Sequence, residues 1–303
     1  MNLFKTIIFL LSVCCLGTIS FGEFSPVKPG FVWQFPRDHG SHPTFKIEWW
    51  YYTGHLLTED DQTYGFELTF FRNAQKELSF SNEWADSHIY MAHFAITDDS
   101  NKQFFYDSRL TRSAYNMAGA STEKLNVFNG NWSVYEQDGL ININASLANR
   151  QLSLKLDSNS PIVFQGKDGF SKKNLEGSLA SYYYSMPRLE GDGKLTIHSQ
   201  EKDIVQASVW FDHEFFSHEL FVGSQGVTDN EILGWDWFAI QLDSGDNIMI
   251  YNVRHSIAEN DYYFGMYMPL TGDYEPLKKE DYSIIVQDTW KSPKTSIEYP
   301  HIW

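Results

Sequence analysis

The sequence predicts an all-β protein built from antiparallel strands, and three observations lead to that fold class. Aromatic residues make up 17% of the 303 residues, and aromatic side chains favour strands. From Phe45 onward, short runs alternate between apolar and polar positions, as in "YGFELTFFR", where Phe66, Leu68 and Phe70 share one face. Connections rich in Gly, Asn, Asp and Ser, such as "TEDDQT" and "EQDG", separate these runs and indicate hairpins.

The first element, residues 1–22, has the pattern of an export signal. Lys5 supplies a positive start, and the apolar stretch "TIIFLLSVCCLGTI" follows it. The small residues Ser20 and Gly22 stand at −3 and −1 of a cleavage site before Glu23. The sequence therefore predicts a secreted or periplasmic protein.

Both cysteines of the chain, Cys14 and Cys15, lie in this segment. A lipid-anchored form acylated on one of them is the alternative, but Val13 and Cys14 are poor residues just before such a cysteine. Cleavage without lipidation is therefore the favoured interpretation. After cleavage the chain has no thiol for a disulfide, a nucleophile or a metal ligand, so its stability rests on its apolar core.

The net charge of −16 argues against two classes of partner. Nucleic acids and acidic membrane surfaces both repel a strongly acidic protein. No later segment is long and apolar enough to span a membrane, so we expect no integral span in the mature chain. The expected partner is an apolar small molecule or a lipid, and the oligomeric state stays open.

The rest of the chain divides into two tandem β units behind a proline-rich start. Residues 23–44 hold four prolines and are expected to form an extended lead-in. We place the first β unit at residues 45–216, a linker at 217–231, and a partial second unit at 232–303.

An internal repeat supports this division. The segment "EWWYYTGHLLTEDDQTYGFELTFFR" (48–72) corresponds to "GWDWFAIQLDSGDNIMIYNVR" (234–254). Each segment begins with a Trp-rich strand, passes through an acidic turn and returns on a strand that ends in arginine. This shared order of features predicts two β units of similar design.

A series of motifs carries a resemblance to a known family. They are "DHGSH", "EWWYYTGHL", "GFELTFFR", "YMAHFAITD", "SYYYSMPRL", "VWFDHEF" and "GWDWFAIQLD". Together they resemble the AttH-like family, which is related to the carotenoid 1,2-hydratases and whose members are often described as predicted secreted hydrolases. The resemblance implies two tandem lipocalin-like β-barrels, and strands that are apolar on both faces suit a small barrel with a lined interior. Because family members continue with further strands, we expect the second barrel to be truncated after Trp303. The alternative is an open second barrel, whose exposed strand edges would invite pairing or aggregation.

The stretch "WFDHEF" supplies the first candidate catalytic residues. On a strand, Trp210, Asp212 and Glu214 share one face, whereas His213 points to the other. An acid next to a histidine suits proton transfer. The alternative is a strand end with a charged rim and an aromatic inner face.

The stretch "GWDWF" supplies another candidate, Asp236, which lies between Trp235 and Trp237. Burial between two rings raises the pKa of a carboxyl group and suits it as an acid. The alternative is a rim carboxylate bonded to backbone amides or to an arginine. By resemblance to the hydratases, His213 and Asp236 are the best catalytic positions. Phe215 stands where we expect another aromatic residue, commonly Trp, in those enzymes.

The stretch "RDHGSH" offers a possible metal site. Asp38, His39 and His42 include an H-x-x-H spacing, and Glu48 can complete the set. The favoured interpretation is that these histidines anchor the lead-in through hydrogen bonds, because catalytic metal sites normally need a third protein ligand that the sequence does not place. We therefore expect neither a metal nor another cofactor.

Aromatic rings dominate the residues expected to bind a ligand. These residues are Trp49, Trp50, Tyr51, Tyr52, His93, Trp210, Trp235 and Trp237. Strand alternation directs Trp50 and Tyr52 to one side and Trp49 and Tyr51 to the other, so only one set lines the interior and the other packs outward. For His93, a hydrogen-bonded interior histidine is the alternative.

Two functions fit these features. The first is acid-catalysed addition of water to a double bond of an isoprenoid or other lipid, as the resemblance to the hydratases implies. The second is a non-enzymatic carrier or chaperone of such a molecule. The sequence lacks a G-x-S-x-G elbow and an H-E-x-x-H motif, so a hydrolase activity gains no support from a known nucleophile or metal motif.

Overall fold

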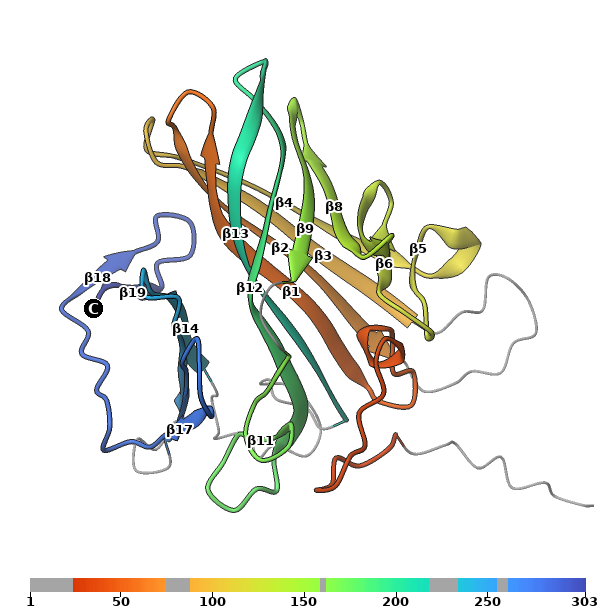
Figure 1. Cartoon of the computed structure of the whole chain (residues 1–303), viewed down its shortest axis with the longest axis vertical. Helices are drawn as coiled ribbons and strands as arrows, with labels where there is room; N and C mark the ends of the chain where they lie inside the picture. The colour runs from red at the N-terminus through yellow and green to blue at the C-terminus, as the bar shows by residue number, and fades with distance from the viewer. Residues whose placement is uncertain (1–23, 75–87, 159–161, 218–233, 255–260) are drawn as a thin grey trace, which may run out of the picture.

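The computed structural model describes five segments of the chain (Figure 1). They are residues 24–74, 88–158, 162–217, 234–254 and 261–303. Apart from the short 3-10 helices η1 (Arg37–His39) and η2 (Ala114–Asn116), the regular structure in them is β, so the all-β prediction is confirmed. Neither helix is long and apolar enough to cross a membrane. The expected export signal and all but one residue of the expected linker lie outside the described segments.

Within these segments, thirteen strands form one antiparallel sheet that curves into a nearly closed barrel (Figure 1). Their order is β4-β3-β2-β1-β13-β12-β9-β8-β7-β6-β5, with β10 and β11 paired to β12. The strands are β1 (Ile47–Thr58), β2 (Thr63–Ala74), β3 (His88–Asp98), β4 (Gln103–Arg112), β5 (Ala118–Ala120), β6 (Asn126–Asn129), β7 (Trp132–Gln137), β8 (Leu140–Leu147), β9 (Arg150–Ser158), β10 (Val163–Phe164), β11 (Phe170–Lys172), β12 (Ala180–Ile197) and β13 (Gln200–Phe216). The lipocalin-like barrel implied by the resemblance is confirmed.

Side chains bridge the gap between the two ends of this sheet. Asn129 in β6 donates to the Tyr90 carbonyl oxygen at 3.2 Å and accepts from the Thr111 hydroxyl at 2.8 Å. Arg109 in β4 donates to the Asn129 carbonyl oxygen at 2.8 Å. These bonds join strands from opposite ends of the sheet, where backbone pairing does not continue.

The barrel interior is a packed core. Alternate residues of each strand point inward, and Trp50, Tyr52, Phe70 and Phe211 are all completely buried there. The rings of Tyr52 and Phe211 stack with centroids 4.4 Å apart. Full burial of one large apolar side chain stabilises a fold by about 1.5–3 kcal/mol, so this filled interior is the main source of stability.

The pairing of β1 with β13 positions the residues discussed below. Tyr51 lies opposite Asp212, and the chains come close enough at Gly54 that a Cβ atom there would lie 2.5 Å from the Ser208 carbonyl oxygen. Only glycine fits at this point of β1 without moving β13.

The lead-in packs against the barrel and is not merely extended. Its aromatic residues Phe31 and Trp33 contact Tyr182 and Phe215 where β12 begins and β13 ends. The Tyr182 hydroxyl accepts from the Lys28 amide at 2.9 Å and donates to the Lys28 carbonyl oxygen at 2.7 Å. The lead-in therefore closes this end of the barrel.

The C-terminal part forms two smaller sheets beside the barrel (Figure 1). The strands are β14 (Gly234–Gln241), β15 (Asn247–Arg254), β16 (Tyr262–Met268) and β17 (Glu275–Leu277) in one sheet, and β18 (Asp288–Lys291) and β19 (Glu298–Ile302) in the other. The two segments of the internal repeat form matching hairpins, in which Glu48 lies opposite Arg72 and Gly234 lies opposite Arg254. The described residues of this part thus form an open four-stranded sheet and a separate hairpin.

Candidate active site

Strand β13 divides the polar residues of "WFDHEF" between two sites. Asp212 and Glu214 point outward from the barrel, whereas His213 points inward, and all three are at most 4% exposed. The barrel wall therefore separates the two carboxyl groups from the histidine.

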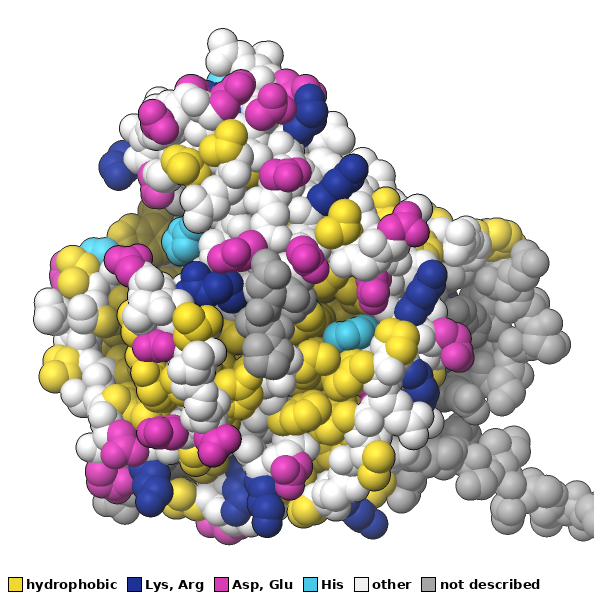
Figure 2. All heavy atoms as spheres, in the orientation of Figure 1, with side chains coloured by type: hydrophobic (Ala, Val, Ile, Leu, Met, Phe, Trp, Pro, Cys, Tyr) yellow, Lys and Arg dark blue, Asp and Glu magenta, His cyan; other side chains and the backbone are white. Residues whose placement is uncertain are grey.

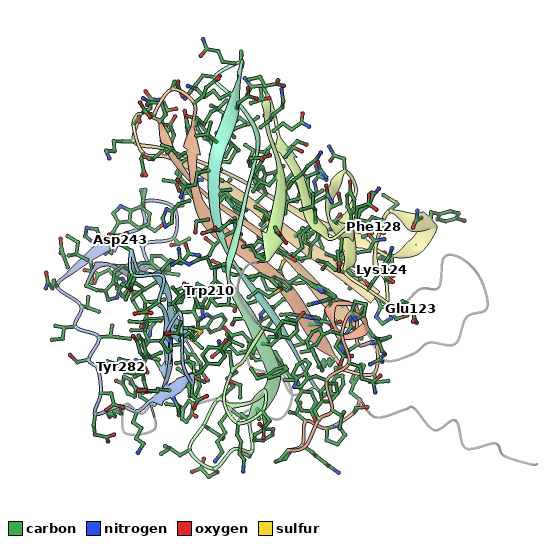
Figure 3. All side chains as sticks on the ribbon, viewed as in Figure 1. Glu123, Lys124, Phe128, Trp210, Asp243 and Tyr282 are labelled. Carbon is green, nitrogen blue, oxygen red and sulfur yellow. The ribbon has the colours of Figure 1, made fainter. Side chains whose placement is uncertain are left out.

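The outward-facing residues belong to a pocket of about 540 Å³ between the barrel wall and the four-stranded sheet. It is lined by Trp49, Tyr51, Thr69, Phe71, Met91, Lys173, Tyr183, Asp212, Glu214, Trp235, Trp237, Tyr251 and Val253. Figure 3 labels Trp210 between the barrel and the smaller sheet. Figure 2, in the same orientation, shows hydrophobic side chains in yellow between polar ones on the face that it draws. The pocket is aromatic and lies outside the barrel.

The strand register arranges the residues on the barrel side of this pocket in rows across neighbouring strands. One row places Asp212 next to Tyr51 and Tyr51 next to Thr69, and the next row begins with Glu214 and Trp49. Directly opposed residues on one face of a sheet have Cβ atoms about 5 Å apart. The carboxyl groups are therefore flanked by aromatic rings.

Asp212 is the titratable group best placed for acid chemistry. Its Oδ1 accepts from the Ser185 hydroxyl at 2.5 Å and from the Trp210 indole N–H at 2.8 Å. Burial raises the pKa of Asp212 to about 7, although these bonds and one from Tyr183 oppose that rise. A large fraction of this carboxyl group is therefore protonated near neutral pH.

A buried ion pair lies at the same wall. Lys173 Nζ is 2.7 Å from Glu214 Oε1, and the Ser181 hydroxyl also donates to this carboxylate. The ammonium group lies 4.7 Å from the ring centroid of Tyr251 and 5.0 Å from that of Tyr183, which are cation–π distances.

The inward-facing site is a closed network centred on Glu48. This carboxylate accepts from Arg72 Nε at 2.9 Å, and it lies 2.8 Å from His42 Nδ1 and 3.0 Å from His213 Nε2. His42 Nε2 lies 3.2 Å from Asp38. The network ties the lead-in to β1, β2 and β13, as the hydrogen-bonding interpretation of "RDHGSH" predicts.

A second hydrogen-bonded chain reaches His213 from the lead-in. The Tyr184 hydroxyl lies 2.7 Å from His39 Nδ1 and 3.1 Å from His213 Nδ1. Both ring nitrogens of His213 therefore have partners, and the ring stacks on Trp50 with centroids 4.9 Å apart.

The charges of the Glu48 network are set by opposing effects. Burial raises the pKa of Glu48, but the Arg72 charge and the two histidines outweigh it and hold that pKa well below its usual range. Burial lowers the pKa of His42, but the carboxylates of Asp38 and Glu48 reverse this and raise it. For His213, burial prevails over Glu48 and lowers the pKa.

The stability contributed by His42 is expected to disappear as the pH rises. Its folded-state pKa lies above the unfolded value of 6.5, so protonation stabilises the fold fully below that pH and no longer does so above the folded pKa. His42→Gln should therefore reduce the decline in the free energy of unfolding between neutral and alkaline pH. Urea unfolding at several pH values measures this, and an unchanged decline in the variant would refute it.

Ligand atoms of His42, Glu48 and His213 lie within 4.8 Å of one another, a spacing that a metal ion can use. However, Arg72 already places a fixed positive charge on Glu48, and the raised pKa of His42 favours a second one. The donor set therefore fits a hydrogen-bonded anchor better than a cation site.

The structure separates the residues expected to bind a ligand. Trp49, Tyr51, Trp235 and Trp237 line the outer pocket, and Trp210 lies beneath it. Trp50 and Tyr52 face the barrel interior, where they pack in the core and not in the pocket. The reason is strand alternation, which sends neighbouring rings of β1 to opposite sides of the wall.

His93 is on the outer face of the barrel wall and not in its interior. It lies opposite Thr69 in β2, and its ring contacts Phe71 and Tyr106 at centroid distances of 5.4 and 5.8 Å. It is outside the set of residues that line the pocket, although Phe71 connects it to them.

Asp236 does not meet His213. Trp235 and Trp237 face the pocket, so alternation turns Asp236 to the other side of β14. There it accepts from Arg254 Nε at 3.1 Å, which matches the alternative of a carboxylate bonded to an arginine. The pair implied by the resemblance is thus split between the barrel interior and the far face of the smaller sheet.

Sequence reasoning missed Lys173, Tyr183 and Tyr251. Tyr183 lies opposite Glu214 across β12 and β13, and the alternating "SYYYS" run carried a signal that one of its tyrosines faces outward. Lys173 follows the short strand β11, and nothing in its local sequence distinguishes it from Lys172.

Comparisons with known proteins agree with this fold. A family model described as AttH-like matches residues 26–303. An AttH protein from Nitrosomonas europaea is 28% identical with a TM-score of 0.79, over 91% of this chain and 82% of that one. Kievitone hydratase from Nectria haematococca is 13% identical with a TM-score of 0.65, over 89% of this chain and 74% of that one, a likeness of fold alone. None of the curated proteins matches.

Proposed function

The chain belongs to the AttH-like family, and on that premise we propose that it adds water to a carbon–carbon double bond of an apolar molecule bound in the outer pocket. One observation carries the proposal: Asp212, a buried carboxyl group with a pKa raised to about 7, lies in an aromatic pocket wall. A general acid works best when its pKa is near the operating pH.

The reaction follows from the groups around Asp212. The protonated carboxyl group transfers its proton to one alkene carbon and forms a C–H bond, which leaves a cation on the other carbon. The rings of Tyr51 and Trp237, which meet edge-to-face with centroids 5.4 Å apart, stabilise that cation. A water oxygen then bonds to the cation, and the surplus proton of that water returns to the Asp212 carboxylate.

The lining residues favour hydration over hydrolysis. In the described part of the chain, the pocket lining contains no serine, cysteine or histidine, so it lacks the Ser–His and Cys–His pairs that many hydrolases use. The similarity of fold to a hydratase supports the same choice.

A lipid or isoprenoid encountered outside the cytoplasm is the ligand class that we propose. The N-terminal export pattern and the aromatic lining support it. Incubation with isoprenoid alkenes followed by mass spectrometry tests the function, because hydration adds the mass of one water. Recovery of the bound ligand unchanged would support a carrier instead.

The rate of hydration is expected to fall as the pH rises through about 7. The acid form of Asp212 is the reactive form, and the fraction in this form declines above its pKa of about 7. A pH profile of kcat measures this dependence. A rate that increases through the same range would contradict the role of Asp212 as an acid.

A further inference from the structure

The ion pair of Lys173 and Glu214 gives the outer pocket a polar end. Both side chains line the pocket, and only 9% of the Lys173 side chain and 6% of the Glu214 side chain are exposed. Removal of two charges from water costs several kcal/mol per ion, and a buried pair often adds no net stability. Its presence in a mostly apolar pocket lining matches the few polar groups that orient a ligand in such pockets.

Neighbouring side chains hold both partners in place. Ser171 Oγ accepts from Lys173 Nζ at 3.3 Å and itself lies 3.2 Å from the Tyr251 hydroxyl. The Ser181 hydroxyl fixes Glu214. Among the described residues, two oxygen atoms accept from Lys173, those of Glu214 and Ser171. Its third N–H has the tyrosine rings near it but no oxygen acceptor among these contacts, so it can donate to a ligand oxygen.

The pair presents a donor and an acceptor side by side with no net charge. A ligand carboxylate would meet repulsion from Glu214, and a ligand amine would meet repulsion from Lys173. An ether or ketone can accept from Lys173 but cannot donate to Glu214, and a hydrocarbon satisfies neither group. A hydroxyl group can do both.

We propose that Lys173 and Glu214 bind a hydroxyl head group, so that the molecule in the pocket is an apolar alcohol or phenol and not a pure hydrocarbon. This inference rests on the proposed function and specifies its substrate. Asp212 and Glu214 lie two residues apart on one face of β13, roughly 7 Å along the strand. A hydroxyl bound at Glu214 therefore places the reacting double bond roughly one such spacing away, at Asp212.

Three ligands with the same carbon chain test the proposal: farnesol, farnesyl methyl ether and the hydrocarbon farnesene. Quenching of tryptophan fluorescence measures binding, because Trp49, Trp235 and Trp237 line the pocket. The protein is expected to bind farnesol about tenfold or more tightly than the other two, as hydrogen bonds to charged groups typically provide. Equal Kd values for all three ligands would overturn the proposal.

Substitution locates the origin of this preference. Lys173→Met should weaken farnesol binding alone and bring the three Kd values within about twofold. Lys172→Met is the matched control, because Lys172 is the neighbouring exposed lysine, and it should keep the preference.

A double variant keeps the test valid if the single Lys173 variant fails to fold. Lys173→Met leaves Glu214 buried without its partner, whereas Lys173→Met combined with Glu214→Met replaces the ion pair by apolar side chains of similar size and removes both charges and both hydrogen-bonding groups at little cost in stability. The double variant should also lose the preference for farnesol. A preference that persists in this folded protein would overturn the proposal.

The experiments distinguish failure of the proposed head-group site from failure of the proposed reaction. A preference for farnesol without any hydrated product would refute the proposed reaction and leave the head-group site standing. Equal binding and equal hydration of farnesol and farnesene would refute the head-group site and leave the reaction standing.

Discussion

Asp212→Asn is expected to lower the rate of hydration by about 10²–10⁴-fold, the usual contribution of a general acid. Asparagine keeps the size of the side chain and an oxygen that can accept from Ser185 and Trp210, but it has no acidic proton to give to the alkene. Ligand binding should change little, because the aromatic walls stay in place. Single-turnover kinetics and a separate measurement of Kd distinguish the two effects.

The matched control is Asp203→Asn. Asp203 is on the same strand, but its side chain is 60% exposed and its nearest cation, Lys194, is 3.6 Å away. This variant should retain the rate of the unsubstituted protein. If both variants reacted equally fast, Asp212 would not be the acid.

Glu48→Gln is expected to lower the free energy of unfolding by about 3–5 kcal/mol, the usual cost of removing one partner from a buried ion pair. Glu48 is completely buried and lies 2.9 Å from Arg72, which is 99% buried. Glutamine leaves the charges of Arg72 and protonated His42 without this counter-ion. Urea unfolding monitored by tryptophan fluorescence measures the loss.

Glu190→Gln serves as the control for stability. Glu190 lies on β12 and is exposed, so its replacement should change the free energy of unfolding by less than about 0.5 kcal/mol. Equal losses from the two substitutions would show that the Glu48 network does not anchor the lead-in.

Much of the architecture could be predicted because its signals are local. The alternation of "KIEWWYYTGHLL" predicts that Trp49 and Tyr51 lie on the face opposite Trp50 and Tyr52, and the structure has this arrangement. The repeat comparison likewise predicts two hairpins of similar strand pairing, and the structure contains both. Period-two alternation and turn composition are properties of single segments, so both can be recognised in the sequence without knowledge of which segments are in contact.

The site was harder to predict because it depends on contacts between distant segments. Alternation cannot tell which face of β1 turns inward, and that choice decides that Asp212 enters the pocket while His213 does not. Lys173 reaches Glu214 only after β11 pairs with β12 and β12 pairs with β13. Asp236 resembles a hydratase acid in sequence, yet Arg254 is its partner across the hairpin.

The most direct test of the central claim is hydration in deuterated water that also carries heavy oxygen. If Asp212 donates its exchangeable proton and water then attacks, the product from a prenyl alcohol should contain one deuterium bound to carbon and one heavy oxygen atom. The Asp212→Asn protein should form almost none of it. A product without carbon-bound deuterium, or recovery of the prenyl alcohol unchanged from the outer pocket, would contradict the account.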